Sequence, residues 1–176
     1  EAICSWADDG VATMNTNEYD AGNTFIAIYY NRLYSGISVC NQYLSAASDI
    51  DATRTAEVRF IRALEFYLAM DAFGNIPLPT TITTDKPMQK KRAEVYAWLE
   101  SELLEIEPAP MTAADTGYGR VDKAAAWMLL SRLYLNAEVY TGTPQWAKAA
   151  LYAKKVIDSS YQLYTTSSAG YSAYRK

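Results

Sequence analysis

Five stretches of the chain place apolar residues at steps of three and four positions, and glycine, proline or serine separates them. This spacing gives a helix one apolar face, so it predicts amphipathic helices. The expected helices cover about 24–47, 53–73, 94–106, 122–140 and 146–157. The sequence therefore predicts an all-α fold.

The stretch over 53–73 has the clearest boundaries. Thr53 or Thr55 can cap its N-terminus, and Gly74 stands where a left-handed C-terminal residue is favoured. Apolar side chains extend around most of the cylinder, so this helix is expected to be mostly buried. The narrow polar wedge that remains consists of Arg59, Arg62 and Glu65.

The last two expected helices resemble one tetratricopeptide-type hairpin. Small residues at Ala149, Ala150 and Ala153 allow two helix axes to approach closely. The helices over 53–73 and 94–106 form a looser copy with a long insertion. Because about three repeat units are needed to bury a continuous core, these two pairs and one further helix indicate a fragment of a larger protein.

Three regions differ in their patterning. Residues 1–23 show no sustained period and are expected to form a loop region, 24–164 hold the tetratricopeptide-like helical domain, and 165–176 form an irregular tail. The tryptophans inside the helices are expected in the core. They are Trp98, Trp127 and Trp146.

Charge and composition exclude several classes of function. The formal net charge of −4 argues against nucleic-acid binding, which needs a basic face. Histidine is absent, which removes the commonest general base and metal ligand. We therefore expect no catalytic residues, no metal site and no cofactor. Cys4 and Cys40 are expected to be free or buried thiols, with a disulfide between them as the alternative.

Four glutamates gather near the end of the helix over 94–106. They are Glu100, Glu102, Glu105 and Glu107. Their steps scatter them around the helix, so a solvated face is expected rather than the carboxylate pair of a glycosidase.

Several motifs occur in a specific order. AEVRFIRA occupies 56–63, FGNIPL occupies 73–78, and GRVDKAA occupies 119–125. LSRLYL follows over 130–135, and NAEVYTG over 136–142. In this order the motifs resemble the SusD/RagB family, and the likeness extends over most of the chain.

The resemblance implies a cell-surface lipoprotein of the outer membrane in Bacteroidetes-type bacteria. Such proteins capture oligosaccharides, here expected to be starch or malto-oligosaccharides, for import through a partner SusC-like TonB-dependent transporter. They are not enzymes, and they contact the membrane only through a lipid anchor, which is not expected within this chain. The alternative is a tetratricopeptide-type scaffold that binds proteins and no glycan.

The resemblance carries glycan contacts to two residues. In the starch-binding members, a tryptophan that stacks on glucose rings follows a glutamate by five positions, and a sugar-binding asparagine lies three further on. Glu1 and Trp6 match this spacing, whereas Asp9 stands at the asparagine position. An ionised aspartate accepts hydrogen bonds but donates none, so the pose of the sugar is expected to differ. The alternative for Trp6 is a loop residue packed against the helices.

Overall fold

The computed structural model describes residues 10–47, 51–109 and 119–161. Its helices are α1 (Val11–Asn15), α2 (Thr24–Ala47), α3 (Ala52–Phe73), α4 (Arg92–Ile106), α5 (Lys123–Leu135), α6 (Ala137–Thr141) and α7 (Trp146–Ile157). Two short strands, β1 (Ile76–Pro77) and β2 (Gln89–Lys90), pair antiparallel at the base of a long loop. The predicted all-α class is confirmed. Among the described helices, none has both the length and the apolar character that crossing a bilayer requires.

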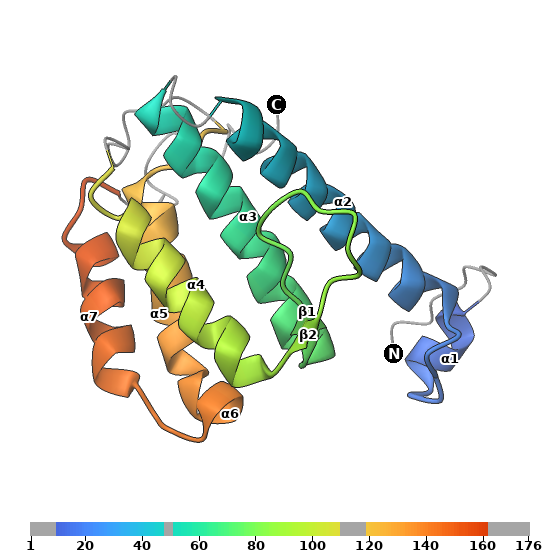
Figure 1. Cartoon of the computed structure of the whole chain (residues 1–176). Coiled ribbons are helices and arrows are strands. Elements are labelled where there is room, and N and C mark those ends of the chain that lie inside the picture. Colours follow the sequence, from blue (N-terminus) through green and yellow to red (C-terminus); the bar gives the residue numbers. More distant parts are fainter. Residues whose placement is uncertain (1–9, 48–50, 110–118, 162–176) are drawn as a thin grey trace, which may run out of the picture.

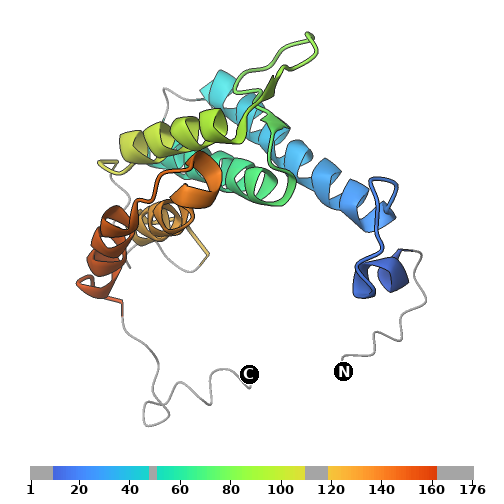
Figure 2. The same cartoon turned by 90° about the horizontal axis from the view of Figure 1, so that it is seen from below.

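The long helices pack as antiparallel neighbours (Figure 1). α2 lies along α3, α3 along α4, and α5 along α7. Seen from below, the elements from α1 to α7 follow an arc (Figure 2). The α5–α7 pair is the hairpin that the sequence predicted, and α3–α4 is its looser partner. The sequence assigned the helix over 24–47 to neither pair. In the structure this helix, α2, packs against α3 over much of its length.

The α3 boundaries show one difference from the sequence prediction. Asp51 caps the helix, because its carboxylate accepts hydrogen bonds from the backbone N–H groups of Thr53 and Arg54 at 2.9 and 3.1 Å. The prediction that Thr53 or Thr55 caps the helix was therefore wrong by a few residues, since the helix begins at Ala52. At the other end, Gly74 has the positive φ that favours glycine, 75°, but its ψ of −104° lies outside the predicted left-handed helical conformation.

The expected single helix over 122–140 is interrupted at Asn136. α5 ends before this residue and the short α6 begins after it. The interruption redirects the chain so that the hydroxyl of Tyr140 donates to Asp71 Oδ1 at 2.6 Å, and its ring lies 6.3 Å from that of Tyr96. Periodicity alone predicts that α5 continues through Asn136. The helix ends there instead, and the residues after it contact α3 and α4.

The core lies between α3, α4 and α5. Its fully buried side chains include Phe66, Met70, Leu99, Leu103, Leu130, Leu133 and Tyr134. Trp98 and Trp127 are half-buried and pack against this core, as expected. Trp146 is 59% exposed, so the prediction that it is a core residue was wrong. The buried face of α7 passes through Ala149 and Tyr152, about 60° and 120° around the helix from Trp146.

The glutamate cluster is only partly the solvated face that its spacing indicated. Glu102 is 7% exposed, and its carboxylate accepts hydrogen bonds from Arg59 Nη2 at 2.6 Å and Arg62 Nη2 at 2.8 Å. Glu105 is exposed and binds the same Arg59 from outside. The prediction was wrong for Glu102 because α4 turns this residue toward the polar wedge of α3.

The remaining two glutamates are half-buried. Glu100 accepts a hydrogen bond from the hydroxyl of Tyr134 at 2.9 Å, and Glu107 accepts one from Trp127 Nε1 at 3.0 Å. Each carboxylate therefore joins α4, or the turn after it, to α5. These acidic residues stabilise helix packing.

Candidate functional site

The predicted glycan-contact residues precede the described part of the chain. Trp6 and Asp9 lie outside the described residues, as do Glu1 and Cys4. The point where their segment joins the fold is described, because Gly10 directly follows Asp9. Gly10 has a φ of 93°, and an added Cβ would lie 2.9 Å from Asn23 Nδ2. Both the backbone and the space at this junction therefore require glycine.

Asn23 anchors this junction to the start of α2. Its buried carboxamide donates from Nδ2 to the Gly10 carbonyl at 2.9 Å and to Thr13 Oγ1 at 3.1 Å. The Oδ1 atom accepts from the backbone N–H groups of Phe25 at 3.0 Å and Ile26 at 3.4 Å, which caps α2. One side chain thus satisfies the helix end and holds the residue next to Asp9.

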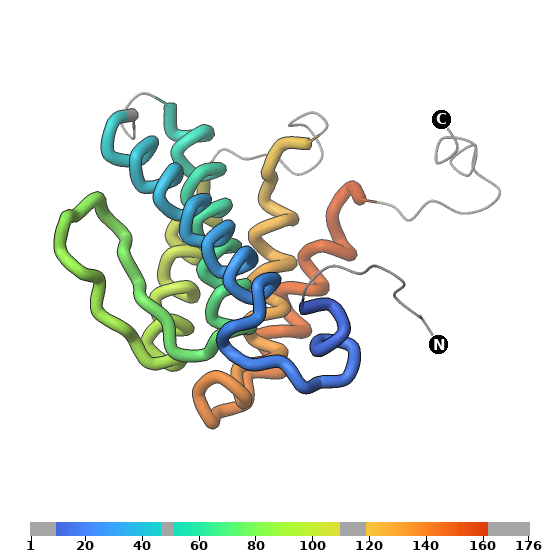
Figure 3. Tube along the Cα trace, turned by 90° about the vertical axis from the view of Figure 1, so that its right-hand side faces the viewer, coloured from blue at the N-terminus to red at the C-terminus, as the bar shows by residue number. Residues whose placement is uncertain are grey.

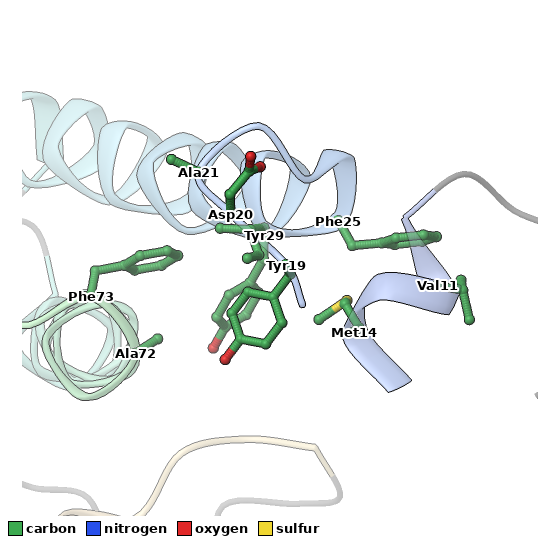
Figure 4. Close-up of a pocket in the computed structure, with 10 residues that line it drawn as sticks. Val11, Met14, Tyr19, Asp20, Ala21, Phe25, Tyr29, Ala72 and Phe73 are labelled. Carbon is green, nitrogen blue, oxygen red and sulfur yellow. The ribbon is translucent and has the colours of Figure 1, made fainter. Parts of the chain in front are cut away.

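An apolar pocket of about 860 Å³, the aromatic pocket, opens beside this junction. Its lining residues come from α1, the segment before α2, the first turns of α2, and the end of α3: Val11, Met14, Tyr19, Asp20, Ala21, Phe25, Ile26, Tyr29, Ala72 and Phe73. Figure 4 shows Phe73 and Phe25 toward opposite ends, with Tyr19 and Tyr29 between them. The two tyrosines are 50% and 41% exposed, so flat aromatic faces are accessible in this pocket.

The aromatic wall follows from helix geometry and one contact between helices. Phe25 and Tyr29 are four residues apart, which places them on one face of α2. At the end of α3, the Phe73 ring lies 6.1 Å from that of Tyr29 and meets Tyr30 edge-on at 5.2 Å. Figure 1 shows the N-terminal end of α2 extending past α3 toward α1. The rings on this end are therefore left partly uncovered.

A polar hollow of about 220 Å³ adjoins the aromatic pocket. The two share Tyr19 and Asp20, and the hollow is also lined by Gly10, Thr13, Glu18, Gly22, Asn23 and Thr24. One Asp20 oxygen accepts the Gly22 N–H at 2.8 Å, which orders the turn. Aromatic faces beside hydroxyl and carboxylate groups match the two sides of a pyranose, whose C–H face is apolar and whose edge carries hydroxyls.

Sequence reasoning missed this pocket. Periodicity assigned Phe25 and Tyr29 to the apolar stripe of a helix, where core packing is the ordinary role. Residues up to 22 were expected to form only loop, whereas α1 supplies Val11 and Met14 to the wall. A sequence signal does exist, since glycine after two aspartates and an asparagine before a helix both favour a specific turn. The meeting of Tyr29 with Phe73 has no sequence signal.

Asn23→Asp is expected to separate the two roles of this residue. The carboxylate keeps the acceptor that caps α2, but it loses the donor to Gly10 and places an oxygen against the Gly10 carbonyl. Local opening of α1 should become easier by about 1–2 kcal/mol, so the Met14 and Thr16 amides should exchange roughly 5- to 30-fold faster. Hydrogen exchange followed by NMR measures these amide rates. Asn31→Asp, at an exposed position of α2, is the control. Equal exchange in both variants would contradict the role of Asn23.

Known proteins are similar to this chain in sequence and in the arrangement of helices. Residues 2–135 match the family described as starch-binding and associating with the outer membrane. The chain is 37% identical over 169 residues to the starch-binding protein SusD of Bacteroides thetaiotaomicron, a match that covers 92% of this chain and 31% of that protein. The chain thus spans about a third of the length of this curated relative.

Two solved structures illustrate the similarity of fold. A SusD superfamily protein from Parabacteroides distasonis has a TM-score of 0.74 at 27% identity, over 87% of this chain and 36% of that one. Surface glycan-binding protein A from Bacteroides uniformis has a TM-score of 0.70 at 26% identity, over 86% of this chain and 36% of that one. Together with the sequence match over 2–135, these likenesses show that the chain belongs to the SusD-like family.

Proposed function

We propose that this chain is the helical part of an outer-membrane surface protein that binds oligosaccharides and does not transform them. The observation that carries the proposal is the aromatic pocket together with the adjoining polar hollow. Gly10, the residue next to Asp9, lines this hollow. Membership of a family described as starch-binding supports it. A neutral sugar needs stacking surface and hydrogen-bonding groups, and the pocket and the adjoining polar hollow supply both, with no cationic side chain among their described lining residues.

In this proposal, Trp6 and Asp9 contact the glycan together with the pocket. Trp6 stacks on the apolar face of a pyranose, and Asp9 accepts hydrogen bonds from its hydroxyls. Tyr19 and Tyr29 extend the stacking surface toward α3. The tether between Asn23 and Gly10 supports this arrangement, because it places the start of the described chain at the rim of the pocket.

The ligand and the partner are proposed from the relatives. Starch or malto-oligosaccharide is the proposed ligand, since the relative from Bacteroides thetaiotaomicron is a starch-binding protein. The intact protein is proposed to be lipid-anchored on the cell surface and to pass its glycan to a SusC-like TonB-dependent transporter. The description of the family as associating with the outer membrane supports this location.

Trp6→Ala is expected to abolish the retardation of the protein in a native gel that contains starch. Tyr29→Ala should weaken it about tenfold, as loss of roughly 1–1.5 kcal/mol of ring stacking implies. Trp146→Ala is the matched control, because this exposed tryptophan lies on α7 and lines none of the hollows described. Unchanged retardation of Trp6→Ala would remove this residue from the site.

A second candidate function is that of a scaffold for another protein. An apolar groove of about 530 Å³ between α2 and α3 favours it, with Val39, Tyr43, Val58 and Ile61 among its lining residues. Tetratricopeptide-like arrays commonly hold partners in such surfaces. If the chain is only a scaffold, no soluble malto-oligosaccharide will give a calorimetric signal or change its tryptophan fluorescence.

A further inference from the structure

The loop over 78–88, between β1 and β2, folds across α2 and forms a separate hollow. Figure 1 shows this green loop crossing α2, and Figure 3 shows it on the side of the molecule away from α7. The hollow has a volume of about 310 Å³, and its described lining residues include none of those that line the aromatic pocket. It lies between one face of α2 and the inner side of the loop.

Three side chains from α2 and α3 hold the loop in place. Each donates a hydrogen bond to a backbone carbonyl of the segment that leaves β1: Tyr34 Oη to Pro77 at 2.7 Å, Asn41 Nδ2 to Pro79 at 2.8 Å, and Arg62 Nη1 to Thr80 at 3.0 Å. Arg62 is itself held by the buried Glu102. The wall of the hollow is therefore preorganised, so a ligand need not order the anchored part of the loop on binding.

The side chains that face the hollow are suited to a neutral polyol. Gln42 and Thr81 line it, and no hydrogen bond joins either side chain to another described residue. The Ser38 hydroxyl donates to a backbone carbonyl and keeps its acceptor capacity. Rings of Pro79 and Pro87 add C–H surface.

The charge of the lining selects against anions. Asp85 is the one charged side chain among the described lining residues, and no lysine or arginine joins it. A carboxylate accepts hydrogen bonds from sugar hydroxyls but repels a ligand of its own sign. The volume stands at the lower end of the range of about 300–1,000 Å³ for small-molecule pockets, which fits a short ligand.

We propose that this hollow is a second saccharide site, which takes one or two neutral pyranose units between α2 and the loop. Gln42 and Thr81 hydrogen-bond the sugar hydroxyls, Asp85 accepts from them, and the proline rings contact the C–H face. The inference rests on the proposed glycan-binding function. It places a second, short sugar contact on the side of α2 that faces away from Tyr29 and the aromatic pocket.

The test is an NMR titration of the full chain with maltose. Maltose should shift the Thr81 backbone amide and the Gln42 side-chain amide. Thr81→Val and Gln42→Ala should each raise the Kd derived from these shifts about five- to tenfold. Thr84, in the same loop, and Asn31, an exposed residue of α2, line no described hollow. Thr84→Val and Asn31→Ala should therefore leave the Kd unchanged. Glucuronate should bind more weakly than glucose, because Asp85 repels it.

The outcomes distinguish this site from the proposed function. Maltose shifts at Thr81 that persist in Trp6→Ala support a separate site. If Trp6→Ala loses starch retardation while maltose leaves Thr81 and Gln42 unshifted, the second site is refuted and the proposed function stands. If neither starch retardation nor any maltose shift occurs in the unsubstituted chain, both fail. Equal Kd values for Thr81→Val and Thr84→Val would also refute the second site.

Discussion

Glu102→Ala is expected to lower the free energy of unfolding by about 3–5 kcal/mol, the range for removing one partner of a buried ion pair. Glu102 holds Arg59 at 2.6 Å and Arg62 at 2.8 Å, and it lies in the interior with Arg62. Without the carboxylate, the guanidinium of Arg62 stays buried with no charged partner among the described residues. Its hydrogen bonds to Asn41 and the Thr80 carbonyl do not compensate for this charge.

Urea unfolding followed by circular dichroism measures the loss. Glu105→Ala is the matched control, because Glu105 binds the same Arg59 with a side chain that is 60% exposed. An exposed ion pair contributes about 0–1 kcal/mol, so this variant should unfold close to the unsubstituted chain. Equal losses in the two variants would show that burial of the pair adds nothing.

The stabilisation by Glu102 should also depend on pH. Burial raises the pKa of this carboxyl, but hydrogen bonds and charge from Arg59 and Arg62 outweigh it and hold the pKa below its ordinary value. A lowered folded-state pKa contributes stability above the unfolded pKa of about 4.3, and this contribution is lost as the pH falls through the folded value. The difference between the unsubstituted chain and Glu102→Ala should therefore shrink in acid below about pH 4.

Phe66→Ala is the second large expected effect, with a loss of about 3–5 kcal/mol in the free energy of unfolding. Phe66 is fully buried on α3, and its ring meets Trp98 edge-on at 5.1 Å. Truncation removes apolar contact and leaves a cavity, because the core residues around Phe66 are themselves closely packed and close the space only in part. Thermal and urea unfolding measure the change.

The contrast with Trp146→Ala makes this prediction specific. Both residues lie on apolar stretches with helical spacing, but Trp146 is largely exposed. Its removal should change the free energy of unfolding by less than about 0.5 kcal/mol. A loss of several kcal/mol from Trp146→Ala would mean that the tryptophan packs in the interior, as its sequence spacing indicates.

The helices and the family were accessible from the sequence. Helical periodicity is a local property, so the stretches over 24–47 and 146–157 match α2 and α7 closely. The order of motifs such as GRVDKAA over 119–125 identified the family, which the match over 2–135 confirms. Trp6 and Asp9, taken from that likeness, stay predictions because they lie outside the described residues.

Which face of each helix is buried was decided by tertiary structure. Periodicity gives the steps around a helix, but the partner chosen for each face depends on residues far away in sequence. Glu102 is buried because α3 brings two arginines to it, and Trp146 is exposed because α5 packs on the neighbouring face of α7. The aromatic pocket exists because the ends of α2 and α3 bring Tyr29 to Phe73. The sequence by itself determined the long helices and the chemistry they carry, whereas contacts between distant segments determined which side chains remain open to a ligand.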